Sequence, residues 1–452
     1  MKPARLIDRE QEWGHLERFV ERGPGLGVVY GARRVGKSFL LACYADAVGG
    51  WRYQAVGGTA AVQLADFGRS LGERLGVGAL AVRDWDDALT RLDQLGDALV
   101  VLDEYPYLRD AVPELDGVLQ RYADRNQRGG LILCGSALST MQALVEPRSP
   151  LYGRASMVLV PGPLTGRDLC ALWGIDRADQ ALWVDAALGG FPGYRPLLRA
   201  PRSLDRWMID EVLSAASPLL DAAEAMLALV PEPVNGQLPR SILSAIAAGQ
   251  RTFAGIGRFT GTPATSLSRP LRTLERAGLV ARVPDPLRNR RDQFSLADPH
   301  LAFWLAVIAP NRSLLSAGRA EAVWHSVHDT TWPSQIVGPR WESAVRAFVE
   351  RTWPVGSEPV RVGVTAVSDP VAKRQHEVDL VVVEGDRVVA VGEAKLRRLD
   401  ARDAERLRRI RELLGAPDAR LILASASGVD ASAQADDVEV IGSADVYPIS
   451  RG

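Results

Sequence analysis

A short glycine-rich segment near the N-terminus constrains the fold of this chain more than any other feature. Residues 31–38 read Gly-Ala-Arg-Arg-Val-Gly-Lys-Ser and match the phosphate-binding loop pattern G-x-x-x-x-G-K-[ST] at every fixed position. Apolar residues 26–30 predict a buried strand before this loop, and residues 39–44 predict a helix after it. Backbone N–H groups of such a loop, together with the helix dipole, favour a bound phosphate chain. We therefore expect an α/β fold with a parallel sheet and a nucleoside triphosphate site.

Five residues of this segment form the expected nucleotide-binding set: Gly31, Arg34, Gly36, Lys37 and Ser38. The glycines allow the backbone to curl around the phosphates. Lys37 would reach the outer phosphates, and the Ser38 hydroxyl would ligate Mg²⁺.

Two further apolar runs end in residues suited to phosphate chemistry. Residues 98–102 predict a buried parallel strand that ends in Asp103 and Glu104. We expect Asp103 to hold Mg²⁺, directly or through water, and Glu104 to polarise the attacking water. Residues 131–134 predict another strand, after which Ser136 would sense the γ-phosphate or position the water. The alternative for Ser136 is an ordinary turn residue.

Several short motifs in this order resemble archaeal-type P-loop ATPases, relatives of the AAA-plus and STAND groups. They occupy residues 6–10, 30–34, 103–108, 134–136, 152–154, 163–164 and 189–194. The resemblance implies ATP as the nucleotide, slow hydrolysis and conformational switching. It also implies that Arg154 reports or stabilises the γ-phosphate, although a solvated loop arginine is the alternative.

Composition limits the remaining possibilities. The 452 residues are too many for one ordinary domain, and 47% hydrophobic with 24% charged residues is typical of a globular protein. No apolar run is long enough to cross a bilayer, and the first residues lack the apolar core of a signal peptide. Three scattered cysteines indicate small buried side chains in a reducing compartment. We expect a cytoplasmic protein without a membrane partner.

A basic segment in the middle of the chain has the pattern of a winged helix-turn-helix. Residues 236–296 contain ten arginines against three acids, a net charge of +7, whereas the whole chain carries −1. The periodicity predicts helices over 238–248, 252–259 and 266–277, then two strands joined by a basic turn. In such a module the third helix enters the DNA major groove and the wing contacts phosphates.

The expected DNA contacts are all arginines. Leu267, Leu271 and Leu274 would pack inward, which leaves the polar side of the third helix outward. The predicted contacts on the third helix are Arg269, Arg272 and Arg276, and those on the wing are Arg288, Arg290 and Arg291. The alternative is that this winged helix is a rigid lid or docking module.

Two strands near the C-terminus carry a third group of charged residues. Residues 376–383 predict a strand containing Asp379, residues 384–386 a tight turn, and residues 387–395 a returning strand with Glu393 and Lys395. Side chains alternate along a strand, so Glu393 and Lys395 share one face. Asp379 and Glu393 would ligate Mg²⁺, and Lys395 would orient or deprotonate the attacking water.

This arrangement resembles the PD-(D/E)xK nuclease core of restriction endonucleases and Holliday-junction resolvases. The resemblance implies that Glu342, on a helix near residues 338–345, is an additional acid. It departs from the motif because no proline precedes Asp379. The alternatives are a degenerate, inactive nuclease fold and a hairpin with incidental charges.

These assignments predict five segments: an ATPase core over 1–161, a helical lid over 162–233, a winged helix with a connecting helix over 234–310, a linker over 311–337 and a nuclease-like α/β domain over 338–452. The expected function is an ATPase that couples nucleotide state to DNA binding, with metal-dependent phosphodiester cleavage as a further activity. The alternatives are an ATP-gated DNA-binding regulator with an inactive nuclease fold, and a signalling ATPase that binds only proteins. Expected ligands and partners are ATP, Mg²⁺ and DNA, and a homo-oligomer is compatible with the sequence.

Overall fold

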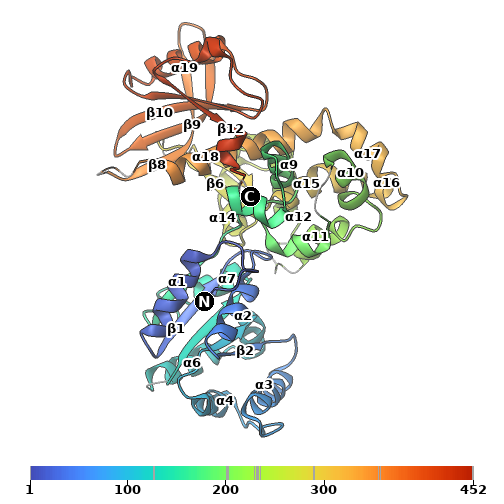
Figure 1. The fold of residues 1–452 in the computed structure, drawn as a ribbon, viewed down its shortest axis with the longest axis vertical. Coiled ribbons are helices and arrows are strands. Elements are labelled where there is room, and N and C mark those ends of the chain that lie inside the picture. The colour runs from blue at the N-terminus through green and yellow to red at the C-terminus, as the bar shows by residue number, and fades with distance from the viewer. Residues whose placement is uncertain are drawn as a thin grey trace. The chain divides into compact units, whose positions relative to one another are not determined.

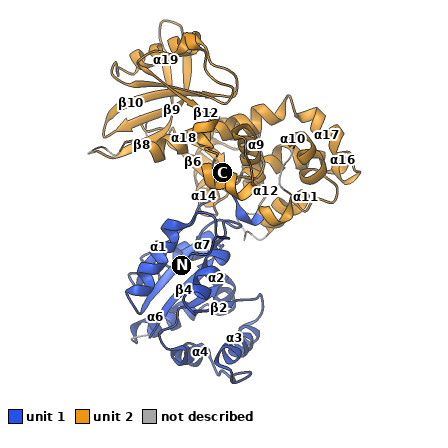
Figure 2. Ribbon diagram, in the orientation of Figure 1, with its two compact units in different colours: residues 1–164, 191–193 blue, residues 165–190, 194–452 orange. Residues whose placement is uncertain are grey.

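The computed structural model describes residues 2–449 apart from 126–127, 200–202, 229, 231–233, 235, 289–290, 355 and 357. The chain forms two compact units, residues 1–164 with 191–193 and residues 165–190 with 194–452 (Figure 2). Each unit has its own hydrophobic cores. The expected end of the lid, at residues 231–233, lies outside the described residues.

A five-stranded parallel sheet forms the centre of the first unit (Figure 1). In the spatial order β2-β3-β4-β1-β5, its strands are β2 (Trp51–Gln54), β3 (Val100–Asp103), β4 (Gly130–Gly135), β1 (Gly25–Tyr30) and β5 (Ala155–Leu159). Side chains of β1 alternate between two cores, with Val28 in one and Val29 in the other. Both faces are covered, which explains why these strands are continuous apolar runs.

Helices cover the two faces of this sheet unequally. One core contains side chains of α1 (Glu10–Glu21) and α2 (Lys37–Ala47). The other contains side chains of α3 (Ala60–Leu75), α4 (Trp85–Arg91), α5 (Tyr105–Ala111), α6 (Leu115–Asp124) and α7 (Leu138–Ala143). Because β4 lies between β1 and β3, the residues that follow β4 are placed between those that follow the other two strands.

The second unit begins with a helical part that extends beyond the expected lid. Its helices are α8 (Gly166–Trp173), α9 (Ala178–Leu188), α10 (Leu204–Trp207), α11 (Leu219–Ala228), α15 (Pro299–Phe303), α16 (Arg312–Ser316) and α17 (Ala320–Val327). Residues 311–337, expected as a linker, are largely helical and contribute buried Trp324 and Trp332. These rings pack edge to face against each other and against Trp183 of α9, which explains why the segment is ordered.

The basic segment folds into three helices and a two-stranded sheet, as its sequence pattern indicates. The elements are α12 (Gln237–Ala247), α13 (Phe253–Thr260), α14 (Ser268–Arg276), β6 (Val280–Val283) and β7 (Gln293–Leu296), with β6 and β7 antiparallel. Leu267, Leu271 and Leu274 are buried in its core, as predicted. Thr252 caps α13 by accepting a hydrogen bond from the Gly255 N–H group.

The C-terminal part contains a mixed five-stranded sheet with helices before and within it (Figure 1). In chain order the elements are α18 (Gly338–Thr352), β8 (Val360–Asp369), β9 (Arg374–Glu384), β10 (Arg387–Lys395), α19 (Ala401–Leu413), β11 (Arg420–Ser425), β12 (Val438–Gly442) and α20 (Ser443–Val446). Strands β8, β9 and β10 pair antiparallel, whereas β10, β11 and β12 pair parallel. The spatial order β12-β11-β10-β9-β8 leaves β8 at one edge.

The base of the wing covers this edge strand. The Val364 N–H group of β8 donates a hydrogen bond of 3.0 Å to the Pro284 carbonyl oxygen, and Thr365 Oγ1 donates to Asp285 Oδ2 at 3.1 Å. Gly363 allows this approach, because a Cβ atom there would lie 2.1 Å from the same Pro284 oxygen. The winged helix and the C-terminal sheet are therefore joined by one main-chain and one side-chain hydrogen bond.

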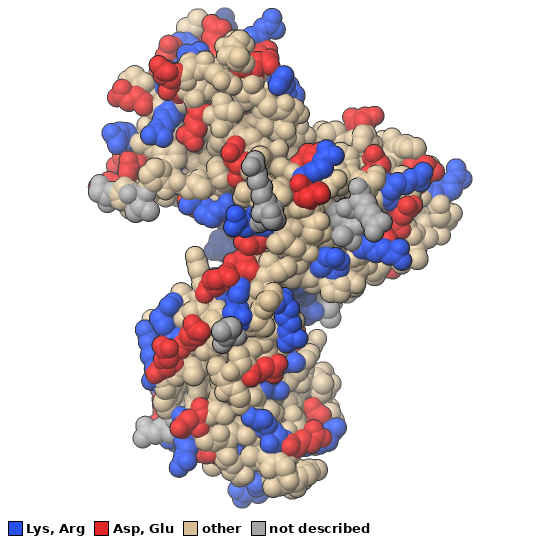
Figure 3. All heavy atoms as spheres, viewed as in Figure 1, with Lys and Arg blue, Asp and Glu red and all other residues tan. Residues whose placement is uncertain are grey.

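The described helices contain none that is both long and apolar enough to span a bilayer. On the face of the molecule in Figure 3, acidic and basic side chains are interspersed.

Candidate functional site

The phosphate-binding loop connects the end of β1 to the start of α2. Two of its residues have positive φ, Arg34 at 66° and Gly36 at 91°. Such angles turn the backbone into a concave arrangement of N–H groups that can surround an anion. Ser38 lies in the first turn of α2 and is half-buried. The geometry brings together the five residues that the sequence pattern identified.

Lys37 has no carboxylate partner within ion-pair distance among the described residues. Its side chain is buried, and Nζ donates hydrogen bonds of 2.9 Å to the carbonyl oxygens of Gly31 and Ala32. Burial lowers the pKa of Lys37 below its usual value, and Glu104 and Asp103 act in the opposite direction. The charge of this ammonium group is thus incompletely balanced, which suits a bound polyphosphate.

The acids at the end of β3 lie, like the loop, at the carboxyl-terminal ends of the parallel strands. Asp103 is fully buried and accepts a hydrogen bond of 3.0 Å from Arg52 Nη1. Glu104 has a φ of 53°, a strained conformation for a residue other than glycine. Ser136 Oγ lies 3.5 Å from Glu104 Oε2, so the residues after β3 and β4 meet. Ser38 and Asp103 provide the hard oxygen donors that Mg²⁺ prefers, provided that Arg52 releases the aspartate.

Two supports of the loop could not be assigned from the sequence. Arg9 Nη2 donates to the carbonyl oxygens of Val35 at 2.9 Å and Gly162 at 2.7 Å, which ties the loop to the end of the core. The Gly193 N–H group donates to the Arg34 carbonyl oxygen at 3.0 Å. Arg9 and Gly193 both belong to motifs that carried the family resemblance, but spacing alone does not show which backbone groups they contact.

Arg154 lies near the amino-terminal ends of the parallel strands, whereas the loop follows the carboxyl-terminal end of β1. It precedes β5, whose Ala155 pairs with Leu26 at the start of β1, about 13 Å before the loop at the usual rise per residue. Its guanidinium forms two hydrogen bonds with Asp124, of 2.8 and 2.9 Å. The expectation that Arg154 contacts the γ-phosphate is therefore corrected for the nucleotide of its own chain.

The third helix of the winged helix presents a row of unpaired cations. Arg269, Arg272 and Arg276 are exposed on α14, and none has an acidic partner among the described residues. Arg282 on β6, in contrast, is neutralised by Glu275 and Asp292. Of the predicted wing contacts, Arg288 and Arg291 are described and Arg290 lies outside the described residues.

Asp379, Glu393 and Lys395 meet on the C-terminal sheet. Lys395 Nζ lies 2.5 Å from Asp379 Oδ2 and 3.8 Å from Glu393 Oε1. Asp379 Oδ2 also accepts a hydrogen bond of 3.0 Å from the Ala394 N–H group, and Glu393 is paired with Arg406 of α19. Burial raises the pKa of Glu393, against the effect of Arg406. Burial alone would lower the pKa of Lys395, but the neighbouring carboxylates raise it above its usual value.

Glu342 does not join this cluster as a third acid. Its Oε2 atom pairs with Arg251 Nη1 of the winged helix at 2.8 Å. Within the described ranges, no three His, Cys, Asp or Glu side chains are grouped closely enough to hold a metal ion. The expected three-carboxylate metal site is therefore corrected to two carboxylates, Asp379 and Glu393, both engaged by cationic side chains.

Two family models match parts of the chain. A model described as MarR family matches residues 240–291, which confirms the predicted winged helix. A model described as archaea bacterial proteins of unknown function matches residues 304–407, which include β9 and β10. Neither description names a nuclease. A search of curated proteins gives no match.

Three solved structures are among those to which this chain is similar. A Walker-type ATPase of Pyrococcus abyssi is 21% identical with a TM-score of 0.50, over 66% of this chain and 96% of that one. The ORC2 protein of Aeropyrum pernix, in ADPNP and ADP complexes, is 18% identical with a TM-score of 0.43, over 71% and 97%. The ORC1 protein of Aeropyrum pernix in complex with DNA is 18% identical with a TM-score of 0.34, over 70% and 95%. With the first of these and the MarR match, the chain has the fold of a Walker-type P-loop ATPase joined to a winged helix.

Proposed function

We propose that this chain is a Mg²⁺-dependent ATPase whose nucleotide state controls its binding to DNA. The observation that carries the proposal is the loop itself, with a buried, incompletely balanced Lys37 among backbone groups suited to phosphate. The similarity to a Walker-type ATPase supports ATP as the nucleotide.

Each residue of the loop region has a distinct part in this proposal. Lys37 binds the outer phosphates, Ser38 and Asp103 hold Mg²⁺, and Glu104 with Ser136 orients the attacking water. The ion supplies charge stabilisation at the transferred phosphoryl group. Arg154, at the far edge of the sheet, could act only on the nucleotide of a second copy of the chain.

Titration with a fluorescent ATP analogue, followed by a phosphate-release assay, tests the nucleotide site. Lys37→Ala should abolish binding, whereas Glu104→Gln should retain binding and lose hydrolysis, because a neutral amide cannot polarise water. Tight binding by Lys37→Ala would contradict the proposal.

DNA binding is proposed for α14, because its exposed arginines have no acidic partner in the described part of the chain. Fluorescence anisotropy with a labelled duplex should show that Arg272→Gln weakens binding and lowers the slope of log K against log salt by about 0.9. Arg319→Gln removes an exposed arginine elsewhere in the second unit and serves as the matched control. Equal effects of both variants would argue for non-specific charge attraction alone.

Metal-dependent phosphodiester cleavage is a second candidate, favoured by the close approach of Lys395 to two carboxylates. Asp379 and Glu393 would hold the ion, and Lys395 would orient the attacking water. Incubation of DNA with Mg²⁺ or Mn²⁺ should give cleavage that Lys395→Ala abolishes. Absence of cleavage with DNA binding retained would favour the alternative, a DNA-binding regulator with an inactive nuclease fold.

A further inference from the structure

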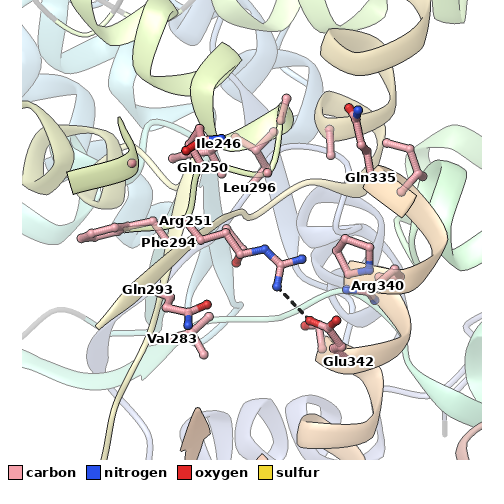
Figure 4. Close-up of a pocket in the computed structure, with 18 of the residues that line it drawn as sticks. Ile246, Gln250, Arg251, Val283, Gln293, Phe294, Leu296, Gln335, Arg340 and Glu342 are labelled. Carbon is pink, nitrogen blue, oxygen red and sulfur yellow. Dashed lines mark hydrogen bonds and ion pairs between the residues drawn. The ribbon is translucent and has the colours of Figure 1, made fainter. Parts of the chain in front are cut away.

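A cavity of about 480 Å³ lies between the winged helix and the C-terminal part of the second unit (Figure 4). One wall comes from the start of α13 and from β7, and the other from α18. This volume falls within the range of small-molecule sites, about 300–1,000 Å³. It accommodates a nucleotide unit of a single strand and is too small for a duplex.

Arginines from both walls line this cavity. They are Arg251 and Arg258 of the winged-helix part and Arg340 and Arg346 of α18, against the two acids Glu342 and Glu377. Arg340 is already paired with Asp185 at 2.7 Å, and its buried Nε atom has no hydrogen-bond partner among the described residues. The other three arginines still outnumber the two acids of the lining, which suits an anion.

The ion pair between Arg251 and Glu342 crosses the cavity from one wall to the other (Figure 4). Both side chains are only partly exposed, at 27% and 19%. A phosphate is a strong acceptor for a guanidinium group and would compete directly with the Glu342 carboxylate for Arg251. Glu342 thus acts as an internal competitor of any phosphate that enters.

Two residues that line the cavity bond to or belong to β9, the strand that contributes Asp379 to the acid–lysine cluster of Asp379, Glu393 and Lys395. Arg346, which lines the cavity, donates a hydrogen bond of 2.9 Å to the Asp379 carbonyl oxygen. Glu377, another lining residue, has its carbonyl oxygen bound by Arg406, the partner of Glu393. The cavity is therefore linked through backbone carbonyl groups of β9 to the strand that carries Asp379.

We propose that this cavity binds a single-stranded segment of nucleic acid, whose phosphate replaces Glu342 as the partner of Arg251. Amide groups of Gln250, Gln293 and Gln335 line the same space and can hydrogen-bond base edges. Displaced Glu342 is then free to turn toward the acid–lysine cluster. This inference rests on the proposed binding of DNA by the winged helix and deepens it by adding a second contact.

Anisotropy with a fluorescein-labelled oligothymidylate, in EDTA to prevent metal-dependent cleavage, tests the inference on the full chain. Arg251→Gln should weaken binding by about fivefold or more, because a charge-assisted contact is lost. It should also lower the salt slope by about 0.7, the value for one single-strand phosphate contact. Glu342→Gln should strengthen binding, because it removes the internal competitor. Opposite signs for the two partners of one ion pair cannot arise from a shared folding defect.

Two further variants sharpen the test. Arg251→Lys keeps the charge without the bidentate geometry and should recover part of the affinity. Arg319→Gln, outside the cavity, should leave binding unchanged. Weaker binding by Glu342→Gln, or indifference to both Arg251→Gln and Glu342→Gln, would overturn the inference.

A duplex measured in parallel separates this inference from the proposed function. One outcome is that duplex binding depends on Arg272 while oligothymidylate binding is unchanged by Arg251→Gln and Glu342→Gln. In that case only the cavity proposal fails. If the wild-type protein binds neither nucleic acid, the proposed DNA-binding function fails as well.

Discussion

The chain contains two lysines close to pairs of acids, and their surroundings differ in charge balance. Among the described residues, Lys37 in the phosphate-binding loop bonds only neutral carbonyl oxygens, and Asp103 beside it is paired with Arg52. Lys395 in the C-terminal sheet bonds Asp379 directly. Burial lowers the pKa of Lys37, whereas carboxylates raise the pKa of Lys395. The first lysine is therefore prepared for an anionic ligand, and the second mainly stabilises its own site.

Removal of Lys37 should change nucleotide binding more than any other substitution described below. Lys37→Ala should weaken binding of a fluorescent ATP analogue by at least about 100-fold, because two charge-assisted contacts at about 1.5–3 kcal/mol each are lost. Isothermal titration calorimetry at matched Mg²⁺ checks the value. Lys395→Ala is the control and should bind the analogue like the wild type, because Lys395 lies outside the first unit.

In thermal unfolding without ligands, substitution of Lys395 should reduce stability more than substitution of Lys37. Lys395→Met leaves Asp379 and Glu393 without a shared cation and should destabilise the second unit by about 1–2 kcal/mol, a value reduced because Lys395 is about one-third exposed. Lys37→Met removes a buried charge that lacks a carboxylate partner, so the first unit should lose no stability. Differential scanning calorimetry measures both. A larger loss for Lys37→Met would contradict the contrast.

Arg9 tests whether the loop is held in shape by its surroundings. Arg9→Lys keeps the charge but cannot bond Val35 and Gly162 in the same geometry. We expect binding of the ATP analogue to weaken by about fivefold to tenfold, because the loop loses contacts that position it. Arg18→Lys, on the exposed side of α1, is the control. Wild-type affinity in Arg9→Lys would show that the loop keeps its shape without this arginine.

Alkaline pH gives the smallest effect, and its sign distinguishes the two lysines. The folded-state pKa of Lys395 is raised, so its stabilising contribution is complete below the unfolded value of about 10.4 and is lost as pH rises through the folded value. The folded-state pKa of Lys37 is lowered, so its cost is complete below that folded value, falls as pH rises above it and is gone above the unfolded value of about 10.4. The stability difference between wild type and Lys395→Met should shrink at high pH. The corresponding difference for Lys37→Met should shift in favour of the wild type.

Local sequence patterns predicted much of the fold. The loop, the strands on either side of Asp103 and Ser136, and the buried leucines of α14 follow from periodicity, because each element alone must bury one face or both. Arg154 could have been placed as well. It precedes a strand, whereas the residues that follow parallel strands form the binding edge.

The contacts that complete the sites could not be predicted in this way. Arg251 and Glu342 are 91 residues apart, and Arg9 and Gly162 are 153 apart. Periodicity shows which side of an element is buried but does not show which distant partner it meets. An isolated arginine therefore looks the same in the sequence whether it faces DNA, a carboxylate or a backbone carbonyl group.

The hydrogen bond from Val364 to Pro284 has a consequence for dividing the protein into fragments. A C-terminal fragment that began after the winged helix would leave the outer backbone groups of β8 without these partners. Exposed strand edges pair with one another, so this fragment should self-associate edge to edge. Gly363, which lets the wing approach, would then also let a neighbouring strand approach. A fragment that keeps residues 236–449 together should remain dispersed.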